Sequence, residues 1–230
     1  FCGLKNFKSK VVKMTQHKFK LIIWDFDGVI ADTEHLWVKN RQKMLNEKFN
    51  LGWDFATANK YLGGMSDKTK RLNLDKLGIK TDDKFWEDAL AADYETMHKG
   101  FCLTKGIEKI FNDKNFKQCI ATGGIRSKTA EKIKTVKIGS LFPDEKIFTA
   151  DMVEHGKPEP DLFWLAAKTM GEQPENCVVI EDSLPGMTAA LRAGMTAVAY
   201  IGCEMNNNPE YVEKIKKLGV KYIFDNMDEQ

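Results

Sequence analysis

Residues 21–30 read Leu-Ile-Ile-Trp-Asp-Phe-Asp-Gly-Val-Ile, and this stretch decides the fold that we expect. Four apolar residues run directly into two acids, Asp25 and Asp27, followed by Gly28. A short run that is apolar on both faces is typical of a buried parallel strand. Side chains two apart in an extended segment point to the same side, so both carboxylates are expected to face one spot where open α/β sheets bind ligands. The alternative is a strand that simply ends in an Asp-Gly turn.

Short apolar runs of the same kind recur along the chain and alternate with segments of helical periodicity. The other predicted strands are residues 118–121, 147–148, 177–180, 196–200 and 222–224. The predicted helices between them are residues 106–111, 127–136, 161–170, 184–193 and 209–218. Strand–helix alternation predicts an α/β fold with a doubly wound, Rossmann-like parallel sheet.

One region breaks this alternation, because residues 33–101 show helical periodicity and no convincing strand. We call this region the helical insertion. Its predicted helices are residues 34–48, 55–61, 67–77 and 82–99. We therefore expect an N-terminal extension (1–17), a Rossmann-like catalytic core (18–32 and 102–230) and an all-α cap domain (33–101). Only two chain crossings would join the cap to the core, which is a geometry suited to opening and closing.

Composition narrows the class of protein. The 230 residues carry a formal net charge of +2, which argues against a dedicated nucleic-acid binder. No apolar run reaches the roughly 18 residues of a membrane span. The five cysteines are scattered without a Cys-x-x-Cys pair, which favours reduced thiols and a cytoplasmic location. The oligomeric state is not predicted, and a monomer is the default.

A second apolar strand also ends in acids, because residues 178–186 read Val-Val-Ile-Glu-Asp-Ser-Leu-Pro-Gly. Asp182 or Ser183 can cap the following helix, but capping leaves Glu181 without a role. Together with the two aspartates of the first strand, these acids make a crowded negative pocket. Crowded carboxylates repel one another unless a cation joins them, and an all-oxygen ligand set suits Mg²⁺.

Two further segments offer groups that could bind phosphate. Thr122, Gly123 and Gly124 follow the second strand, where a hydroxyl and successive backbone N–H groups could cradle phosphate or simply form a turn. Lys157 lies in the stretch Gly-Lys-Pro-Glu-Pro-Asp at residues 156–161. This lysine could offset the charge of a nucleophile and a phosphoryl group, or it could be one more solvated lysine.

Taken in order, these segments resemble the four motifs of the haloacid dehalogenase superfamily. The similarity spans residues 19–224, and residues 25–34 and 181–187 are similar to the subgroup that contains phosphoglycolate phosphatase, sugar-phosphate phosphatases and β-phosphoglucomutase. Members of that subgroup carry a helical cap between the first motif and the second strand. The resemblance implies a phosphoric monoester hydrolase that acts on a small phosphorylated metabolite.

The resemblance also implies a role for each motif residue, and the chemistry of the side chains agrees with it. Asp25 would be the nucleophile that forms an aspartyl-phosphate, and Asp27 would be the general acid and base. Thr122 and Lys157 would hold the phosphoryl oxygens. The implied Mg²⁺ ligands are listed here together: Asp25, the main-chain carbonyl of Asp27, and Asp182, with Glu181 close by or acting through water.

Three residues outside the core motifs are weaker candidates for substrate contacts. Gly64 and Ser66 lie in a segment that resembles the loop which this subgroup turns onto the substrate. The alternative is a turn between helices, with Ser66 as a helix cap. Arg126 could add a phosphate contact or be an ordinary residue at the start of a helix.

Asp27 and the residues on the first helix of the insertion distinguish between the possible reactions. The dehalogenases of the superfamily lack a second aspartate at the position of Asp27, because displacing halide requires no acid. In β-phosphoglucomutase a histidine lies on the first cap helix, and here Trp37 occupies the corresponding place, with His35 two residues earlier. This departure favours hydrolysis over mutase activity. A phospho-aspartate signalling protein and a catalytically inactive scaffold are the non-enzymatic alternatives.

Overall fold

The computed structural model describes residues 19–203, 206 and 208–227, so the predicted N-terminal extension lies outside the described residues. Six parallel strands form one sheet in the order β3-β2-β1-β4-β5-β6. This sheet confirms the predicted doubly wound α/β core. The strands are β1 (Leu21–Trp24), β2 (Lys117–Thr122), β3 (Ile147–Thr149), β4 (Cys177–Glu181), β5 (Thr196–Tyr200) and β6 (Tyr222–Phe224).

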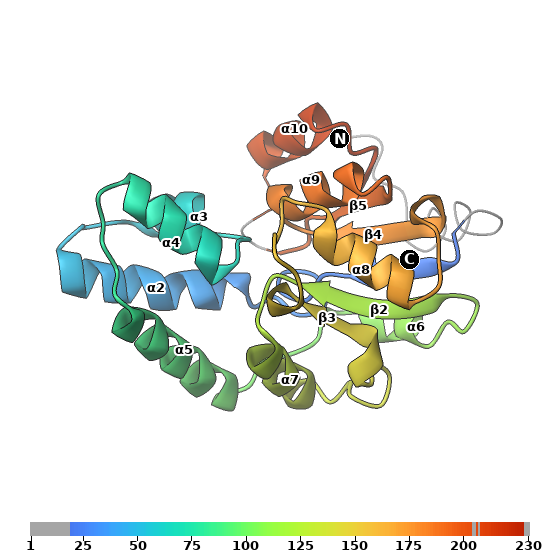
Figure 1. Ribbon diagram of the computed structural model, residues 1–230, viewed down its shortest axis with the longest axis horizontal. Helices are drawn as coiled ribbons and strands as arrows, with labels where there is room; N and C mark the ends of the chain where they lie inside the picture. Colours follow the sequence, from blue (N-terminus) through green and yellow to red (C-terminus); the bar gives the residue numbers. More distant parts are fainter. Residues whose placement is uncertain (1–18, 204–205, 207, 228–230) are drawn as a thin grey trace.

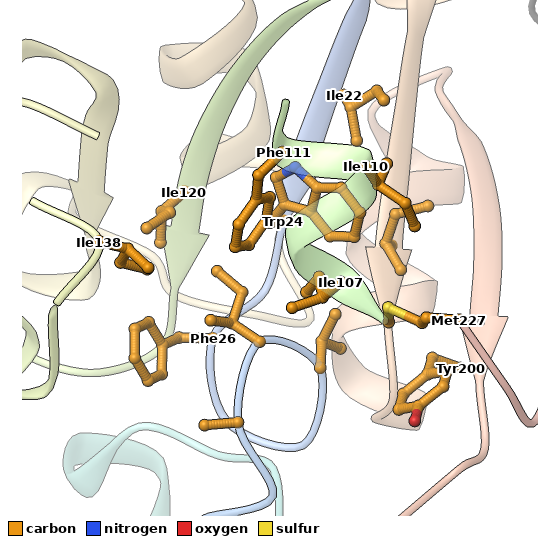
Figure 2. Packing of buried hydrophobic residues seen from close by; sticks show 14 of the residues in the cluster. Ile22, Trp24, Phe26, Ile107, Ile110, Phe111, Ile120, Ile138, Tyr200 and Met227 are labelled. Atoms are coloured by element: carbon orange, nitrogen blue, oxygen red, sulfur yellow. The ribbon is translucent and has the colours of Figure 1, made fainter. Parts of the chain in front are cut away.

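Strand β1 lies in the middle of the sheet, between β2 and β4, and both of its faces are covered. Ile22 and Trp24 belong to the apolar cluster that includes α6 (Ile107–Phe111), whereas the alternate residues pack with α8 (Asp161–Thr169) and α9 (Leu184–Arg192). The Trp24 ring lies beside Phe111 (Figure 2) and meets it edge to face. The ring centroids are 5.3 Å apart. The Trp24 indole N–H also donates to the buried Gln118 Oε1 at 3.0 Å. The period of two along β1 therefore divides the core into two layers.

The remaining core helices cover the same two faces. They are α7 (Arg126–Thr135) and α10 (Pro209–Lys217), and short 3₁₀ turns cover 144–146, 150–152 and 174–176. The described cysteines Cys102, Cys119, Cys177 and Cys203 are unpaired. Among the described residues, no helix combines the length and the apolar character that a membrane crossing would require.

The helical insertion lies between β1 and β2 and has an apolar cluster of its own. Its helices are α2 (Glu34–Phe49), α3 (Phe55–Leu62), α4 (Asp67–Lys76) and α5 (Asp83–His98), and Figure 1 shows them to one side of the sheet. The two chain crossings lie side by side, because Thr104 N donates to Ile30 O at 2.8 Å. Helix α5 also packs against α7 of the core. The cap boundaries at 32/33 and 101/102 stay a prediction.

Candidate active site

The carboxyl ends of β1, β2 and β4 open into a cavity of about 310 Å³ that the helical insertion partly encloses. Most of the candidate site residues from the sequence line it. They are Asp25, Asp27, Gly64, Ser66, Thr122, Gly123, Gly124, Lys157, Glu181 and Asp182. The fold therefore brings together groups from five separate segments of the chain.

One side of the cavity floor holds three buried carboxylates and one ammonium group; we call it the acidic side. Asp25, Glu181 and Asp182 each place an oxygen within 4.8 Å of the others. Lys157 Nζ donates to Asp25 Oδ1 and to Glu181 Oε1, both at 2.5 Å, and to the main-chain oxygen of Ala121 at 3.2 Å. Burial raises the pKa of Asp25 to about 8, with Lys157 opposing the shift and Glu181 adding to it.

The two acids at the carboxyl end of β4, Glu181 and Asp182, make different contacts. Glu181 Oε2 accepts from the backbone N–H and the hydroxyl of Ser183, each at 2.9 Å. Ser183 also accepts from Gly186 N at 3.1 Å, so it is Ser183 and not Asp182 that caps α9. Asp182 Oδ2 accepts from Asn206 Nδ2 at 2.9 Å. Burial, and then the neighbouring Glu181 charge, raise the pKa of Asp182 well above its usual value.

Gly28 explains how the first motif approaches the acidic side so closely. Its φ is +84°, and a Cβ at this position would collide with the carboxylate of Asp182. Both the backbone conformation and the close approach therefore require glycine.

Asp27 has different surroundings, because the extended strand ends before the two aspartates and the alternation of side chains ends with it. Its Oδ1 accepts from Thr33 Oγ1 at 2.5 Å and from Trp37 Nε1 at 2.6 Å. Its Oδ2 accepts from Lys132 Nζ at 2.5 Å. Burial favours the neutral form, but the charges of Lys132 and Lys128 outweigh it and hold the pKa of Asp27 below its usual value. We call Asp27 with these two lysines the basic side.

Thus the expectation that both carboxylates face one spot is correct only in part. Both line the cavity, but Asp25 binds Lys157 and Asp27 binds Lys132.

A buried ion cluster connects the basic side to the helical insertion. Lys128 Nζ donates to Asp93 Oδ2 at 2.5 Å, and Arg41 donates to both oxygens of Asp93 at 2.6 and 2.7 Å. Lys128 Nζ also lies 3.9 Å from the centre of the Trp37 ring. Burial, and then the charge of Arg41, lower the pKa of Lys128 to about 8.

Sequence reasoning missed these contacts, although the sequence carried a signal for them. Arg41 follows Trp37 and Val38 on the buried face of α2, and Asp93 follows Ala89 on the buried face of α5. Opposite charges at apolar positions of two helices indicate a buried ion pair, because charged residues are almost never fully buried unless they are paired.

Thr122, Gly123 and Gly124 lie where a phosphate cradle was predicted. Thr122 is 1% exposed, and its Oγ1 accepts from Gly124 N at 3.3 Å. Nothing lies within 4 Å of the position of a Cβ on Gly123, so this backbone faces open space. Arg126 does not line the cavity; its guanidinium donates to the main-chain oxygens of Ile147 at 2.8 Å and Asp144 at 3.2 Å. The ordinary structural interpretation of Arg126 therefore holds.

The candidate residues of the insertion reach the core. A Cβ on Gly64, whose φ is +67°, would lie 2.7 Å from Ser183 Cβ. The Gly64 N–H donates to Glu34 Oε1 at 2.6 Å. Ser66 accepts from Thr69 N at 3.3 Å and caps α4, as the alternative interpretation predicted, and it also lines the cavity.

The acidic side has the donor set of a divalent cation site. Asp25, Glu181 and Asp182 are buried, contribute only oxygen atoms and carry more negative charge than Lys157 alone can balance. Such hard oxygen donors fit a hard cation. The side chain of Asp27 is not part of this group.

Comparison with known proteins agrees with this geometry. Residues 22–200 match the family model described as haloacid dehalogenase-like hydrolase. The chain is 23% identical over 197 residues to the phosphorylated carbohydrates phosphatase of Thermotoga maritima, covering 84% of this chain and 89% of that protein. It is 29% identical over 194 residues to SUPPRESSOR OF QUENCHING 1, chloroplastic, of Arabidopsis thaliana, covering 79% of this chain but only 18% of that protein.

Among solved structures, a hydrolase from Pseudomonas syringae superimposes with a TM-score of 0.73 and 26% identity, covering 91% of this chain and 94% of that one. The family match covers strands β1 to β5 of the core together with the helical insertion. The chain belongs to the haloacid dehalogenase-like hydrolase family.

Proposed function

We propose that this protein is a Mg²⁺-dependent phosphatase that hydrolyses a small phosphorylated metabolite, a sugar phosphate or a phosphoglycolate-like compound, through an aspartyl-phosphate on Asp25. One observation carries the proposal: Asp25 lies buried at the floor of the cavity, bound to Lys157 and within 4.8 Å of two further carboxylates. The phosphatase name of the Thermotoga maritima relative supports the same reaction class. The cytoplasm is the proposed location.

In the first step, an oxygen of Asp25 attacks phosphorus and the bond from phosphorus to the leaving oxygen breaks. Asp27 passes to that oxygen the proton that it took from water in the preceding turnover, so an alcohol and not an alkoxide departs. Lys132 and Lys128, which hold the pKa of Asp27 low, favour this release of the proton. In the second step, Asp27 takes a proton from water, the water oxygen attacks the phosphorus, and Asp25 is regenerated as inorganic phosphate leaves. The hydroxyl of Thr122 and the ammonium of Lys157 hold the phosphoryl oxygens.

The proposed ligands of Mg²⁺ are Asp25, the main-chain carbonyl of Asp27, and Asp182. Glu181 acts close by, because both of its oxygens already accept hydrogen bonds from Lys157 and Ser183. When bound, Mg²⁺ would offset the negative charge of nucleophile and phosphoryl group, and it would keep Asp25 ionised despite its burial.

The lining of the cavity fits a polar substrate. Beyond the motif residues, the lining contains acidic and basic side chains. Glu34 and Asp67 are among the acids, and Lys68 and Lys70 are among the lysines. Groups of both signs can donate to and accept from the hydroxyl groups of a sugar. The relative from Thermotoga maritima is named for phosphorylated carbohydrates.

The test is a screen of the purified protein against phosphorylated metabolites with Mg²⁺, with EDTA, and as Asp25→Asn. We expect phosphate release that needs the metal and that disappears in Asp25→Asn. Metal-independent turnover, or turnover undiminished in the variant, would contradict the proposal. Conversion of glucose 1-phosphate to glucose 6-phosphate in excess of phosphate release would instead indicate a mutase.

A further inference from the structure

Lys128 is a buried lysine of the core that touches two helices of the insertion, and the proposed reaction gives it no part. It is 8% exposed, and its Nζ donates to Asp93 Oδ2 on α5 at 2.5 Å. The same Nζ lies 3.9 Å from the centre of the Trp37 ring on α2. One ammonium group of α7 therefore binds both insertion helices at once, by an ion pair and by a cation–π contact.

The Trp37 ring is held between Lys128 and Asp27. Its face meets the ammonium group, and its Nε1 donates to Asp27 Oδ1 at 2.6 Å. An indole has a single N–H donor, so the orientation of the ring decides whether that donor reaches the carboxylate. Trp37 is 2% exposed and lies in the wall of the cavity.

Asp93 is anchored within the insertion independently of Lys128. Arg41 donates to both of its oxygens, and Asn40 Nδ2 donates to its Oδ1 at 2.9 Å. Asp93 is thus a fixed point of the insertion, and removing Lys128 leaves it paired. The contact between Lys128 and Asp93 therefore forms only when the insertion lies in this position on the core.

We propose that Lys128 is a positioning residue that binds Asp93 and the face of the Trp37 ring together. In this way it aligns the Trp37 N–H with Asp27. The orientation of Asp27 is thereby coupled to the position of the helical insertion on the core. The inference rests on the proposed function, in which Asp27 protonates the leaving oxygen. Without Lys128 the indole loses the cation that faces its ring, and its N–H is less well aligned with Asp27. The carboxyl group, still bound by Thr33 and Lys132, then occupies more orientations. Phosphate binding by Thr122 and Lys157 does not depend on this alignment.

The first test compares Lys128→Met with Lys134→Met on two substrates. Lys134 lies on the same helix, its side chain is 77% exposed, and it forms an ion pair with Glu131. An alkyl ester such as β-glycerol phosphate needs the acid, whereas p-nitrophenyl phosphate has a leaving group that does not. Because general acid catalysis supplies a rate factor of about 10²–10⁴, we expect Lys128→Met to lower kcat about tenfold on the alkyl ester only, with KM unchanged.

Two further variants ask whether Lys128 acts through Trp37. We expect Trp37→Phe to lower kcat on the alkyl ester to a similar degree, and the double variant to be no slower than the slower single variant. Lys128→Arg should recover most of the activity. Equal losses on both substrates, or losses that multiply in the double variant, would overturn the inference. If Lys128→Met fails to fold, Lys128→Gln, which keeps a donor for Asp93 but lacks the positive charge, provides the same comparison.

A measurement without turnover separates this inference from the proposed function. The indole N–H resonance of Trp37, assigned by its loss in Trp37→Phe, should shift in Lys128→Met and stay in place in Lys134→Met. A resonance that does not move in Lys128→Met would overturn the alignment. A wild-type protein without phosphatase activity would overturn the proposed function. The Trp37 resonance would then still show whether Lys128 aligns the indole N–H.

Discussion

Asp25 and Asp27 lie two residues apart, yet the surroundings of their carboxylates are opposite in charge. On the acidic side, one ammonium group faces three buried carboxylates, and the pKa of Asp25 is raised to about 8. On the basic side, Lys132 and Lys128 hold the pKa of Asp27 below its usual value. The chain balances the charge of Asp27 with its own lysines, but it leaves the acidic side with excess negative charge. A cation from solution is therefore expected at Asp25 and not at the side chain of Asp27.

The largest expected effect is that of Asp25→Asn. An amide cannot form the acyl-phosphate, so kcat should fall by about 10⁴-fold or more, the scale seen when a nucleophile is removed. Initial rates with Mg²⁺ on the best substrate of the screen measure it. Because the amide also removes one buried negative charge, the variant should unfold no more easily than the wild type. A stable variant that keeps its activity would show that the acidic side does not hold the nucleophile.

Lys157→Met should have the next largest effect, and this effect is a loss of folding stability. The change leaves Asp25 and Glu181 buried without their shared partner, which typically costs about 3–5 kcal/mol of the free energy of unfolding. Chemical denaturation without metal measures this loss. Lys132→Met is the matched change on the basic side, where Thr33 and Trp37 still donate to Asp27, so its loss should be smaller. Equal losses would remove the contrast between the two sides.

Asp27→Asn tests the basic side through catalysis. Loss of the acid should lower kcat by about 10²-fold on alkyl phosphates, within the range for general acid catalysis, and by much less on p-nitrophenyl phosphate. Paired kinetics on the two substrates measure the difference. The same loss on both substrates would indicate a role for Asp27 other than proton transfer.

The smallest expected effect is a pH dependence of stability in the metal-free protein. The folded-state pKa of Asp25, about 8, lies above the ordinary aspartate value of 3.8, so its contribution to stability is complete below pH 3.8. The contribution is lost as pH rises through the folded pKa. The pKa of Asp27 is shifted downward, so its contribution changes only in acid and is constant in this window.

Thermal melting in EDTA between about pH 5 and pH 9 should therefore show a midpoint that falls with pH. Mg²⁺ should raise the midpoint more at the upper end of this range, and Asp25→Asn should flatten the curve. A metal-free midpoint that rises with pH would contradict the assignment of charge to the acidic side.

The strands were predictable because each is a short apolar run between polar tips. The predicted strand at residues 21–24 is β1, and the neighbouring strands differ from prediction by at most one residue at each end. The convergence of Asp25 and Glu181 followed from the rule that parallel strands end at one edge of the sheet. These predictions needed only local pattern and topology.

The contacts of Asp27 were not predictable in the same way. They depend on how α2 and α7 meet the core, and a helical period states which face is buried but not what that face contacts. Lys132 is an example, because it lies on the buried face of α7 beside Thr129 and Ile133, where a lysine indicates a buried anion. Identifying that anion as Asp27 required the structure, since 105 residues separate the two.

The most direct test of the central claim is to trap the phosphoryl group on the enzyme. Protein mixed with excess substrate and Mg²⁺ is quenched in acid within the first turnover, digested, and analysed by mass spectrometry. The account predicts a phosphoryl group on Asp25, in the peptide that contains residues 21–30, and its absence in Asp25→Asn. Turnover that continues while the peptide stays unmodified, or a phosphoryl group on another residue, would contradict it.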